Sequence, residues 1–388
     1  MTTPSPAGYA TGRALRPSAK SLPEHSRSHN RALVLQTLYR SGGVSRADLA
    51  RATGLTRVTI SDLVAQLITE DLVVELGQRT ASPNGAARPG KPATLLDINR
   101  TGFQILGLDL SDHALFRGGV LDLDGAVLEH REVALENATG DICVEKVIAL
   151  TRELIAAATA PILGIGVGSP GVVDLGGTVL SAPNLGWTDL PLQALLAEAT
   201  GLPVLVANDA NAAVLAEHSF GGALSDTMLV KIGHGVGAGL LLGGTPLFGN
   251  RFAAGELGHV VVGTDGGAPC ACGKVGCLET WLAIPRLEAA LAAAPTERRR
   301  TEILTEAGER LGIALAPVVG ALDLAELVLS GPADLLDGPL TEAAIDTLRT
   351  RTMAAFHGDL MVRMTALGQD IVMRGAAAMV LSGQLGVS

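Results

Sequence analysis

The spacing of apolar positions predicts a helical segment at the start of the chain. From Ser28 apolar residues recur at helical spacing, until a Gly-Gly pair at 42–43 ends the pattern. Ser45, with Asp48 three residues later, has the pattern of a helix N-terminus, and Gly54 predicts the end of that second helix. Two short helices are therefore expected before residue 55.

A third helix is expected to begin after Thr56, because the apolar residues that follow lie on one face. These residues are Ile60, Leu63, Val64 and Leu67. Two helices joined by a tight turn that contains Gly54 are typical of a helix-turn-helix. Near the start of the third helix, outside the apolar stripe, lie Arg57, Thr59 and Ser61. A recognition helix meets base edges there, so we expect these three residues to contact DNA.

Two extended segments, 72–76 and 93–98, predict a β-hairpin after the third helix. The long polar stretch between them contains Arg79, Arg88 and Lys91. We interpret it as a basic wing that contacts DNA.

Charge is distributed unevenly along the chain. Residues 1–100 carry 13 Lys and Arg against 7 Asp and Glu, whereas residues 101–388 carry 16 against 32, giving net charges of +6 and −16. A basic head on an acidic body favours DNA binding by the head. We therefore predict a winged helix-turn-helix DNA-binding domain over residues 27–98, preceded by a disordered tail over residues 1–26. The alternative for the head is a small helical module that binds proteins.

Beyond Asn99, short apolar runs alternate with helical stretches rich in Ala and Leu, which indicates an α/β architecture. The predicted strands are 104–110, 121–123, 162–168, 204–207, 228–232, 238–242 and 327–329. The predicted helices are 142–158, 211–220, 286–294, 302–316 and 375–384. Asp109 and Asp209 follow two of the strands, and ligands of open α/β sheets bind at such strand ends.

Composition excludes several classes of protein. Of the 388 residues, 47% are hydrophobic and 18% are charged, which excludes global disorder and coiled coil. No apolar run approaches the roughly 18 residues that a membrane span needs, and no signal peptide is recognisable. We expect a cytoplasmic protein without a membrane partner. Its 4 cysteines are too few for a disulfide scaffold.

Three cysteines, Cys270, Cys272 and Cys277, lie within eight residues, and His259 precedes them. Three thiolates and one imidazole form a closed tetrahedral site without an open position for water, so we predict a structural Zn²⁺. The alternative is three unligated thiols in a flexible loop. Cys143 stands alone in an apolar stretch and is expected in the core.

At these positions the sequence resembles the ROK family of repressors, open reading frames and sugar kinases. The segment 255–259 reads Gly-Glu-Leu-Gly-His, and the run 270–279 matches the family pattern Cys-x-Cys-Gly-x-x-Gly-Cys-Leu-Glu. The resemblance extends from Arg27 to the C-terminus, with supporting segments at 164–171, 183–187 and 207–211. It implies a two-lobed, actin-like sugar kinase body over residues 99–388.

The resemblance also implies a sugar pocket. Carboxylates and amides on rigid turns suit the hydroxyls of a pyranose ring. The expected sugar-binding residues are Asn184, Asn208, Asp209, Glu256, His259 and Glu279. Asp209 would contact the hydroxyl that kinases phosphorylate, and His259 would bind zinc through one ring nitrogen and face the sugar with the other. Alternatively, Asn208 and Asp209 merely cap the helix that follows.

The nucleotide side departs from the kinases that the sequence resembles. Their phosphate turn reads Asp-x-Gly-Gly-Thr, whereas residues 109–113 read Asp-Leu-Ser-Asp-His, and Asp112 places a negative charge where phosphates would lie. The second phosphate segment, 233–239, has His234 in place of a threonine, and Pro332 replaces a glycine. We therefore predict that the protein rejects ATP and is not an enzyme. Asp209 would be the remnant of the kinase base, so no catalytic residue is expected.

These features predict a transcriptional regulator, a repressor of sugar metabolism or transport genes, that binds a sugar without phosphorylating it. Its expected partners are a palindromic double-stranded operator, the sugar effector and further copies of itself in a homodimer or homotetramer. One alternative is an ATP-dependent sugar kinase with a DNA-binding head, which Asp209 and the glycines of 233–239 favour. Another is a regulator whose pocket binds no sugar. We further hypothesise that the zinc loop relays sugar binding to the heads.

Overall fold

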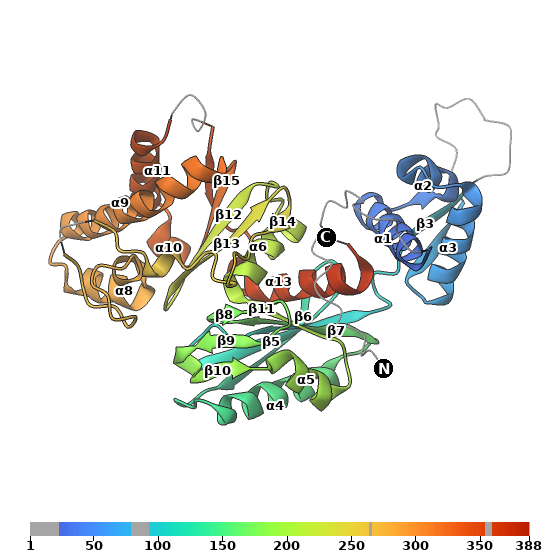
Figure 1. The fold of residues 1–388 in the computed structure, drawn as a ribbon, viewed down its shortest axis with the longest axis horizontal. Coiled ribbons are helices and arrows are strands. Elements are labelled where there is room, and N and C mark those ends of the chain that lie inside the picture. The colour runs from blue at the N-terminus through green and yellow to red at the C-terminus, as the bar shows by residue number, and fades with distance from the viewer. Residues whose placement is uncertain (1–22, 79–92, 264–265, 354–358, 388) are drawn as a thin grey trace.

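The computed structural model describes residues 23–78, 93–263, 266–353 and 359–387. Figure 1 shows a small N-terminal head, coloured blue, beside a body of two lobes. The C-terminal helix, coloured red, lies between the two lobes, and its C-terminal end reaches toward the head. No helix within the described ranges is both long enough and apolar enough to cross a membrane.

The head contains three helices and a three-stranded sheet of order β1-β3-β2. Its elements are α1 (Pro23–Ser41), β1 (Val44–Ser45), α2 (Arg46–Thr53), α3 (Arg57–Thr69), β2 (Val73–Gln78) and β3 (Thr94–Ile98). The predicted helices and hairpin strands are present. The predicted tail, residues 1–26, extends too far, because α1 already begins at Pro23. A proline is tolerated in the first turn of a helix. The short strand β1 was not predicted.

Local sequence explains the turn between α2 and α3. Ser45 accepts a hydrogen bond from the Asp48 N–H at 3.2 Å, and the Asp48 carboxylate accepts one from the Ser45 N–H at 3.0 Å. This capping box begins α2 as the sequence predicts. Gly54 ends the helix with a φ of 72°, which an L side chain rarely adopts. The Thr56 hydroxyl caps α3.

The two lobes share one topology. The first sheet has the order β11-β7-β4-β5-β6 and the second β14-β13-β12-β15-β16. The first comprises β4 (Gln104–Asp109), β5 (Leu115–Leu121), β6 (Val127–Ala134), β7 (Ile162–Ser169) and β11 (Val204–Asn208). The second comprises β12 (Thr227–Ile232), β13 (Val236–Leu242), β14 (Thr245–Pro246), β15 (Glu326–Ser330) and β16 (Met361–Met364). Each sheet is an antiparallel meander extended by two parallel strands, and this duplication confirms the predicted actin-like body. The predicted strand 121–123 is wrong, because β5 ends where that prediction begins.

Helices cover both sheets and also fill the space between them (Figure 1). The outer face of the first sheet packs against α4 (Asp141–Ala157) and α5 (Leu192–Thr200), next to a small sheet of β8 (Val172–Val173), β9 (Val179–Ala182) and β10 (Trp187–Leu190). The second lobe carries α7 (Glu279–Leu282), α8 (Ile284–Ala293), α9 (Glu297–Leu322), α10 (Ala333–Leu336) and α11 (Pro339–Arg351). Between the sheets lie α6 (Asp209–Phe220) and α13 (Ile371–Val380), and α13 continues into a π-helical turn, Leu381–Leu385.

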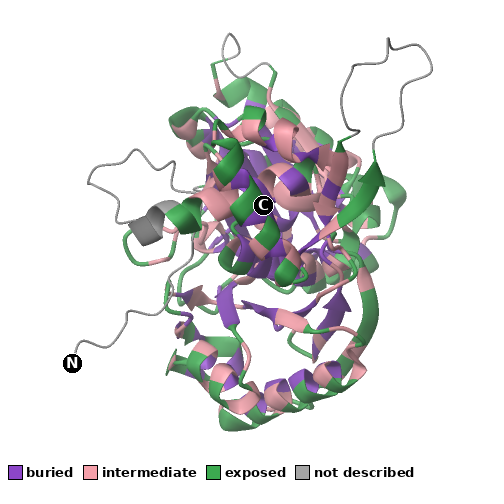
Figure 2. Ribbon diagram, turned by 90° about the vertical axis from the view of Figure 1, so that its right-hand side faces the viewer, coloured by how far each residue is buried: buried purple, intermediate pink, exposed green. Residues whose placement is uncertain are grey.

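Close backbone contacts hold α13 in this central layer. A Cβ atom on Gly375 would lie 1.8 Å from the Ala212 carbonyl oxygen of α6, and one on Gly166 would lie 2.1 Å from the Ala376 carbonyl oxygen of α13. Only glycine permits such approaches. Figure 2 shows buried positions gathered on the strands and on the helices between them.

The head and the body share one hydrophobic cluster. Leu35 and Leu38 of α1 belong to the same buried cluster as Leu121 of β5 and Leu381 beyond α13. The Tyr39 hydroxyl donates a hydrogen bond to the Leu123 carbonyl oxygen at 2.7 Å. The head is therefore packed onto the body in this structure.

Candidate functional site

Asn208 and Asp209 lie in the centre of the body, where β11 ends and α6 begins. The Asn208 side-chain oxygen accepts hydrogen bonds from the N–H groups of Ala210 and Asn211 at 2.9 and 3.1 Å, so Asn208 does cap the helix. Its amide nitrogen donates to the Gly171 carbonyl oxygen at 2.8 Å and to Asp209 Oδ1 at 3.0 Å. Asn208 therefore holds the Asp209 carboxylate in place.

Sequence reasoning missed Lys231, which lies against this carboxylate. Lys231 Nζ is 3.0 Å from Asp209 Oδ2 and donates a hydrogen bond to Ser111 Oγ at 3.0 Å. Burial alone lowers the pKa of Lys231, but the carboxylates of Asp209 and Asp109 outweigh burial and raise it, so the ammonium stays charged. Lys231 belongs to β12 of the second lobe and Ser111 follows β4 of the first, so the lysine bridges the lobes.

Asp109 lies beneath this lysine and is buried, with 5% of its surface exposed. It accepts a hydrogen bond from the Ser111 N–H at 2.9 Å. Burial raises the pKa of Asp109, and the charge of Lys231 opposes burial without cancelling it. The Lys231 ammonium therefore faces two carboxylates, those of Asp209 and Asp109, where the two lobes meet.

Two of the segments that depart from the kinase pattern, the turn with Asp112 and His113 and the turn with His234, meet in the structure. His113 follows β4 and His234 follows β12, and their ring centroids are 3.5 Å apart. Arg117 Nη2 lies 3.5 Å from an oxygen of Asp112. Partial burial lowers the pKa of His234, and nearby His113 lowers it further. Side chains thus occupy the positions where the kinase turns have glycines and threonines.

Three of the predicted sugar residues form a group in the second lobe. Burial raises the pKa of Glu256, His259 opposes this effect, and the carboxylates of Asp209 and Glu279 add to it. Glu279 Oε2 also accepts a hydrogen bond from the Val236 N–H at 3.4 Å. A carboxyl group with a raised pKa stays protonated up to a higher pH than usual. The protonated form both donates and accepts hydrogen bonds, which suits sugar hydroxyls.

Asn184 is separate from this group. It lies in the 3₁₀ turn Pro183–Leu185 of the first lobe and is exposed. Among the contacts of the described residues, none joins Asn184 to the other five predicted sugar residues. Asp209, by contrast, is near this group, because its carboxylate helps to raise the pKa of Glu256.

The cysteine loop brings four metal ligands together. One donor atom from each of His259, Cys270, Cys272 and Cys277 lies within 4.8 Å of the others. Cys270 Sγ is 3.6 Å from His259 Nδ1, and Cys272 Sγ is 3.6 Å from Cys277 Sγ. Tetrahedral zinc with bonds of about 2.3 Å separates its sulfur ligands by roughly 3.7 Å, so these donors fit the ion. Because Nδ1 faces the loop, Nε2 of His259 remains available for another contact.

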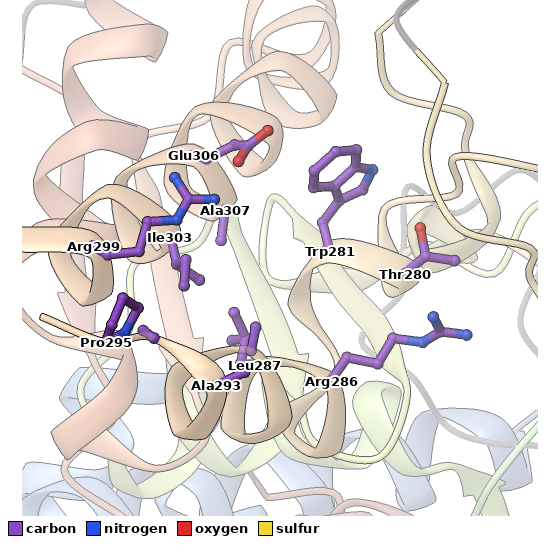
Figure 3. A pocket seen from close by; sticks show the side chains of 12 residues that line it. Thr280, Trp281, Arg286, Leu287, Ala293, Pro295, Arg299, Ile303, Glu306 and Ala307 are labelled. Atoms are coloured by element: carbon purple, nitrogen blue, oxygen red, sulfur yellow. The ribbon is translucent and has the colours of Figure 1, made fainter.

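A cavity in the second lobe does not coincide with the predicted sugar site. It has a volume of about 380 Å³ and lies among α7, α8 and α9 (Figure 3). Trp281, Leu287 and Ile303 are among the residues that line it, and none of the six predicted sugar residues does. Arg310 lies over the Trp281 ring at 4.5 Å from its centroid.

The predicted recognition surface lies at the start of α3. Arg57 and Ser61 are exposed, and Thr59 Oγ1 is 2.9 Å from Thr56 Oγ1. No ion pair among the described residues involves Arg57, whereas Arg51 of α2 pairs with Asp48. The predicted wing residues lie outside the described part of the chain; these are Arg79, Arg88 and Lys91.

Two models of known protein families match this chain. A model of the ROK family matches residues 106–382, and a model of the MarR family matches residues 27–85. A putative xylose repressor from Caldicellulosiruptor sp. (strain Rt8B.4) is 28% identical over 391 residues, which cover 92% of this chain and 96% of the relative.

Two solved structures are also similar. The crystal structure of a ROK family transcriptional regulator, a homolog of the E. coli MLC protein, has a TM-score of 0.80 and 26% identity, and the match covers 93% of this chain and 98% of that chain. A ROK family glucokinase from Streptomyces griseus, in complex with glucose and AMPPNP, has a TM-score of 0.60 and 25% identity. The glucokinase match covers 71% of this chain and 98% of the glucokinase. The family match spans most of the body, and the regulator match includes the head, so this chain belongs to the ROK family and carries a MarR-type DNA-binding head.

Proposed function

We propose that this protein is a cytoplasmic repressor of sugar metabolism or transport genes, and that it binds a sugar effector between its lobes without phosphorylating it. The pairing of Lys231 with Asp209 carries this proposal. The relative named a putative xylose repressor and the similar ROK family transcriptional regulator support the repressor function.

The residues around Asp209 are poorly suited to phosphoryl transfer. A catalytic base must accept a proton from the sugar hydroxyl, but Asp209 Oδ2 is already paired with the Lys231 ammonium at 3.0 Å. Asp112 would repel a polyphosphate by about 1 kcal/mol at 4 Å even in a water-like dielectric. The rings of His113 and His234 occupy the space between the two turns. These features favour a sensor over the alternative of a kinase with a DNA-binding head.

For sugar binding we propose Asp209, Glu256, His259 and Glu279 as the central residues, with Asn208 orienting Asp209 and Asn184 approaching from the first lobe. Hydroxyls of a sugar would compete with Lys231 for the Asp209 carboxylate. Sugar binding would then change the contact that joins β12 to the first lobe.

A single helix links this site to the head. Asp209 is the first residue of α6 and Phe220 is the last, a span of about 18 Å for 12 residues. A Cβ atom on Gly125 would lie 2.8 Å from the Phe220 ring, and Gly125 belongs to the turn whose Leu123 carbonyl accepts the Tyr39 hydroxyl. A shift of α6 would therefore reach α1 through this turn. These contacts favour α6 over the zinc loop as the relay.

Operator binding tests this function. DNA from upstream of the gene for this protein is labelled, and its affinity for the full chain is measured at fixed salt with and without each of a panel of pentoses and hexoses. We expect one sugar to change the affinity by about 5–150-fold, the usual range of allosteric coupling. Unchanged affinity with every sugar would favour the alternative of a regulator that binds no sugar.

Arg57→Ala is expected to weaken operator binding by about 5–150-fold, because a good arginine contact to a base contributes about 1–3 kcal/mol. The matched control is Arg298→Ala on α9, whose side chain is 88% exposed and lies on the second lobe. Fluorescence anisotropy with the same labelled DNA measures both variants. Equal affinities for Arg57→Ala and the unmodified protein would contradict a base contact by Arg57.

For the cysteine loop we propose Zn²⁺ as the metal, held by His259, Cys270, Cys272 and Cys277. When bound, the ion would supply a cross-link between the loop and the turn that carries His259. Metal analysis of the untagged protein should find about one zinc per chain, and Cys277→Ser should lose it. Cys143→Ser is the control and should retain zinc, because the Cys143 thiol is buried in α4 and donates a hydrogen bond to the Ala138 carbonyl oxygen at 3.1 Å. A protein without zinc before substitution would contradict this assignment.

A further inference from the structure

The first hairpin of each lobe carries a histidine in its turn, and the two histidines meet where the lobes face each other. Asp112 and His113 lie in the turn between β4 and β5, and His234 lies in the turn between β12 and β13. The two imidazole rings are inclined by 47° with their centroids 3.5 Å apart. Because the two sheets have the same topology, these turns hold corresponding positions in the lobes. The contact therefore joins one lobe to the other.

A carboxylate completes the cluster. One donor atom from each of Asp112, His113 and His234 lies within 4.8 Å of the others. His113 Nδ1 is 3.5 Å from Asp112 Oδ1. That same oxygen accepts a hydrogen bond from the Ala114 N–H at 2.8 Å, which holds the carboxylate in the turn. Bonds of about 2.1 Å place neighbouring ligands of a metal roughly 3.0–3.4 Å apart. Both histidines are exposed, so their side chains can rotate and shorten the distances between donor atoms by the ångström or so that a bound metal requires.

We propose that Asp112, His113 and His234 form a second divalent metal site, distinct from the cysteine loop, which fastens the two lobes together. Two imidazoles and one carboxylate suit Zn²⁺, Co²⁺ or Ni²⁺, and water would fill the remaining positions. The ligands come from both lobes, so the site is complete only when the lobes are arranged as in this structure. A bound ion would therefore favour this arrangement of the lobes.

The charges around the cluster set its expected strength. Arg117 lies 3.5 Å from the other oxygen of Asp112 and also pairs with Glu132 at 3.1 Å. Lys231 is a second cation near the cluster. It lowers the pKa of His234, whereas the carboxylate of Glu288 raises it. The two cations oppose an incoming metal ion, whereas the cysteine loop offers three thiolates. We expect the second site to bind metal more weakly than the loop, so it is tested with the loop already filled.

Calorimetric titration with Ni²⁺ tests the site. The full chain is prepared without a histidine tag, its cysteine loop is loaded with zinc, and free metal is removed. The variants are His113→Gln and His234→Gln, and the control is His130→Gln, which removes a half-exposed histidine of β6 outside the cluster. We expect the unmodified protein and the control to bind one further equivalent of Ni²⁺, and both cluster variants to lose it.

Thermal unfolding shows whether the ion fastens the lobes. Ni²⁺ should raise the unfolding temperature of the unmodified protein and of His130→Gln, and should leave that of the two cluster variants unchanged. Unfolding temperatures measured without Ni²⁺ show that each variant is folded. The proposal is overturned if the unmodified protein binds no further Ni²⁺, if both cluster variants still bind it, or if only one of them loses it, because a site between the lobes needs both histidines.

Discussion

Arg363→Met will lower the free energy of unfolding by about 3–5 kcal/mol, because it leaves two buried carboxylates without their cation. Arg363 Nη2 lies 2.7 Å from Glu217 Oε2, and Arg363 Nε lies 2.7 Å from Glu326 Oε1. The Glu217 and Glu326 side chains are 0% and 2% exposed. Glu217 belongs to α6 and Glu326 to β15, so the network fixes α6 against the second sheet. Chemical denaturation of the full chain measures the loss.

The matched control for this prediction is Arg349→Met. Arg349 pairs with Asp346 on α11, and their side chains are 68% and 77% exposed. A surface pair of this kind contributes about 0–1 kcal/mol, so the control should change stability little. Equal losses for the two variants would contradict the importance of the buried network.

Asp209→Asn will weaken sugar binding by about 10–150-fold, since a hydrogen bond to a charged group contributes about 1.5–3 kcal/mol. The substitution keeps the size of the side chain, and Lys231 still has Asp109 and Ser111 as neighbours. Calorimetry with the sugar that changes operator affinity measures the loss. Operator affinity of the variant should no longer respond to this sugar at concentrations that change the affinity of the unmodified protein.

Asp334→Asn is the control for that experiment. Asp334 is exposed on α10 and is not one of the proposed sugar-binding residues. The substitution Asp334→Asn removes the same charge as Asp209→Asn and should leave sugar affinity unchanged. Sugar affinity that is unaffected by Asp209→Asn would remove Asp209 from the binding site.

Elements with a strong apolar pattern were predictable from the sequence. The runs that form β7, β12 and β15 are almost wholly buried, so their apolar residues stand out. By contrast, β6 lies at the edge of its sheet and has only exposed and partly exposed positions, and it was missed. The predicted helix 302–316 stopped before Pro317, but α9 continues through that proline to Leu322 because its packing in the second lobe, with Val319 fully buried, outweighs the lost hydrogen bond.

The candidate site was predictable only where its residues stand close together in the sequence. The cysteine loop and the Asn208–Asp209 pair are local patterns, and the structure brings their members together. Lys231 gave no such signal, because a lysine within an apolar run reads as one polar position of a strand. Its partner Ser111 is 120 residues away and lies on the other lobe. The meeting of His113 and His234 likewise depends on how the two lobes pack.

The most direct test of sensing without catalysis is to incubate the protein with ATP, Mg²⁺ and the same panel of pentoses and hexoses, and to measure sugar phosphate. We predict that the sugar which changes operator affinity is recovered unmodified, because Asp209 is paired with Lys231 and the rings of His113 and His234 lie between the phosphate turns. Formation of its phosphate above the rate without protein would contradict this prediction and identify the protein as a sugar kinase with a DNA-binding head.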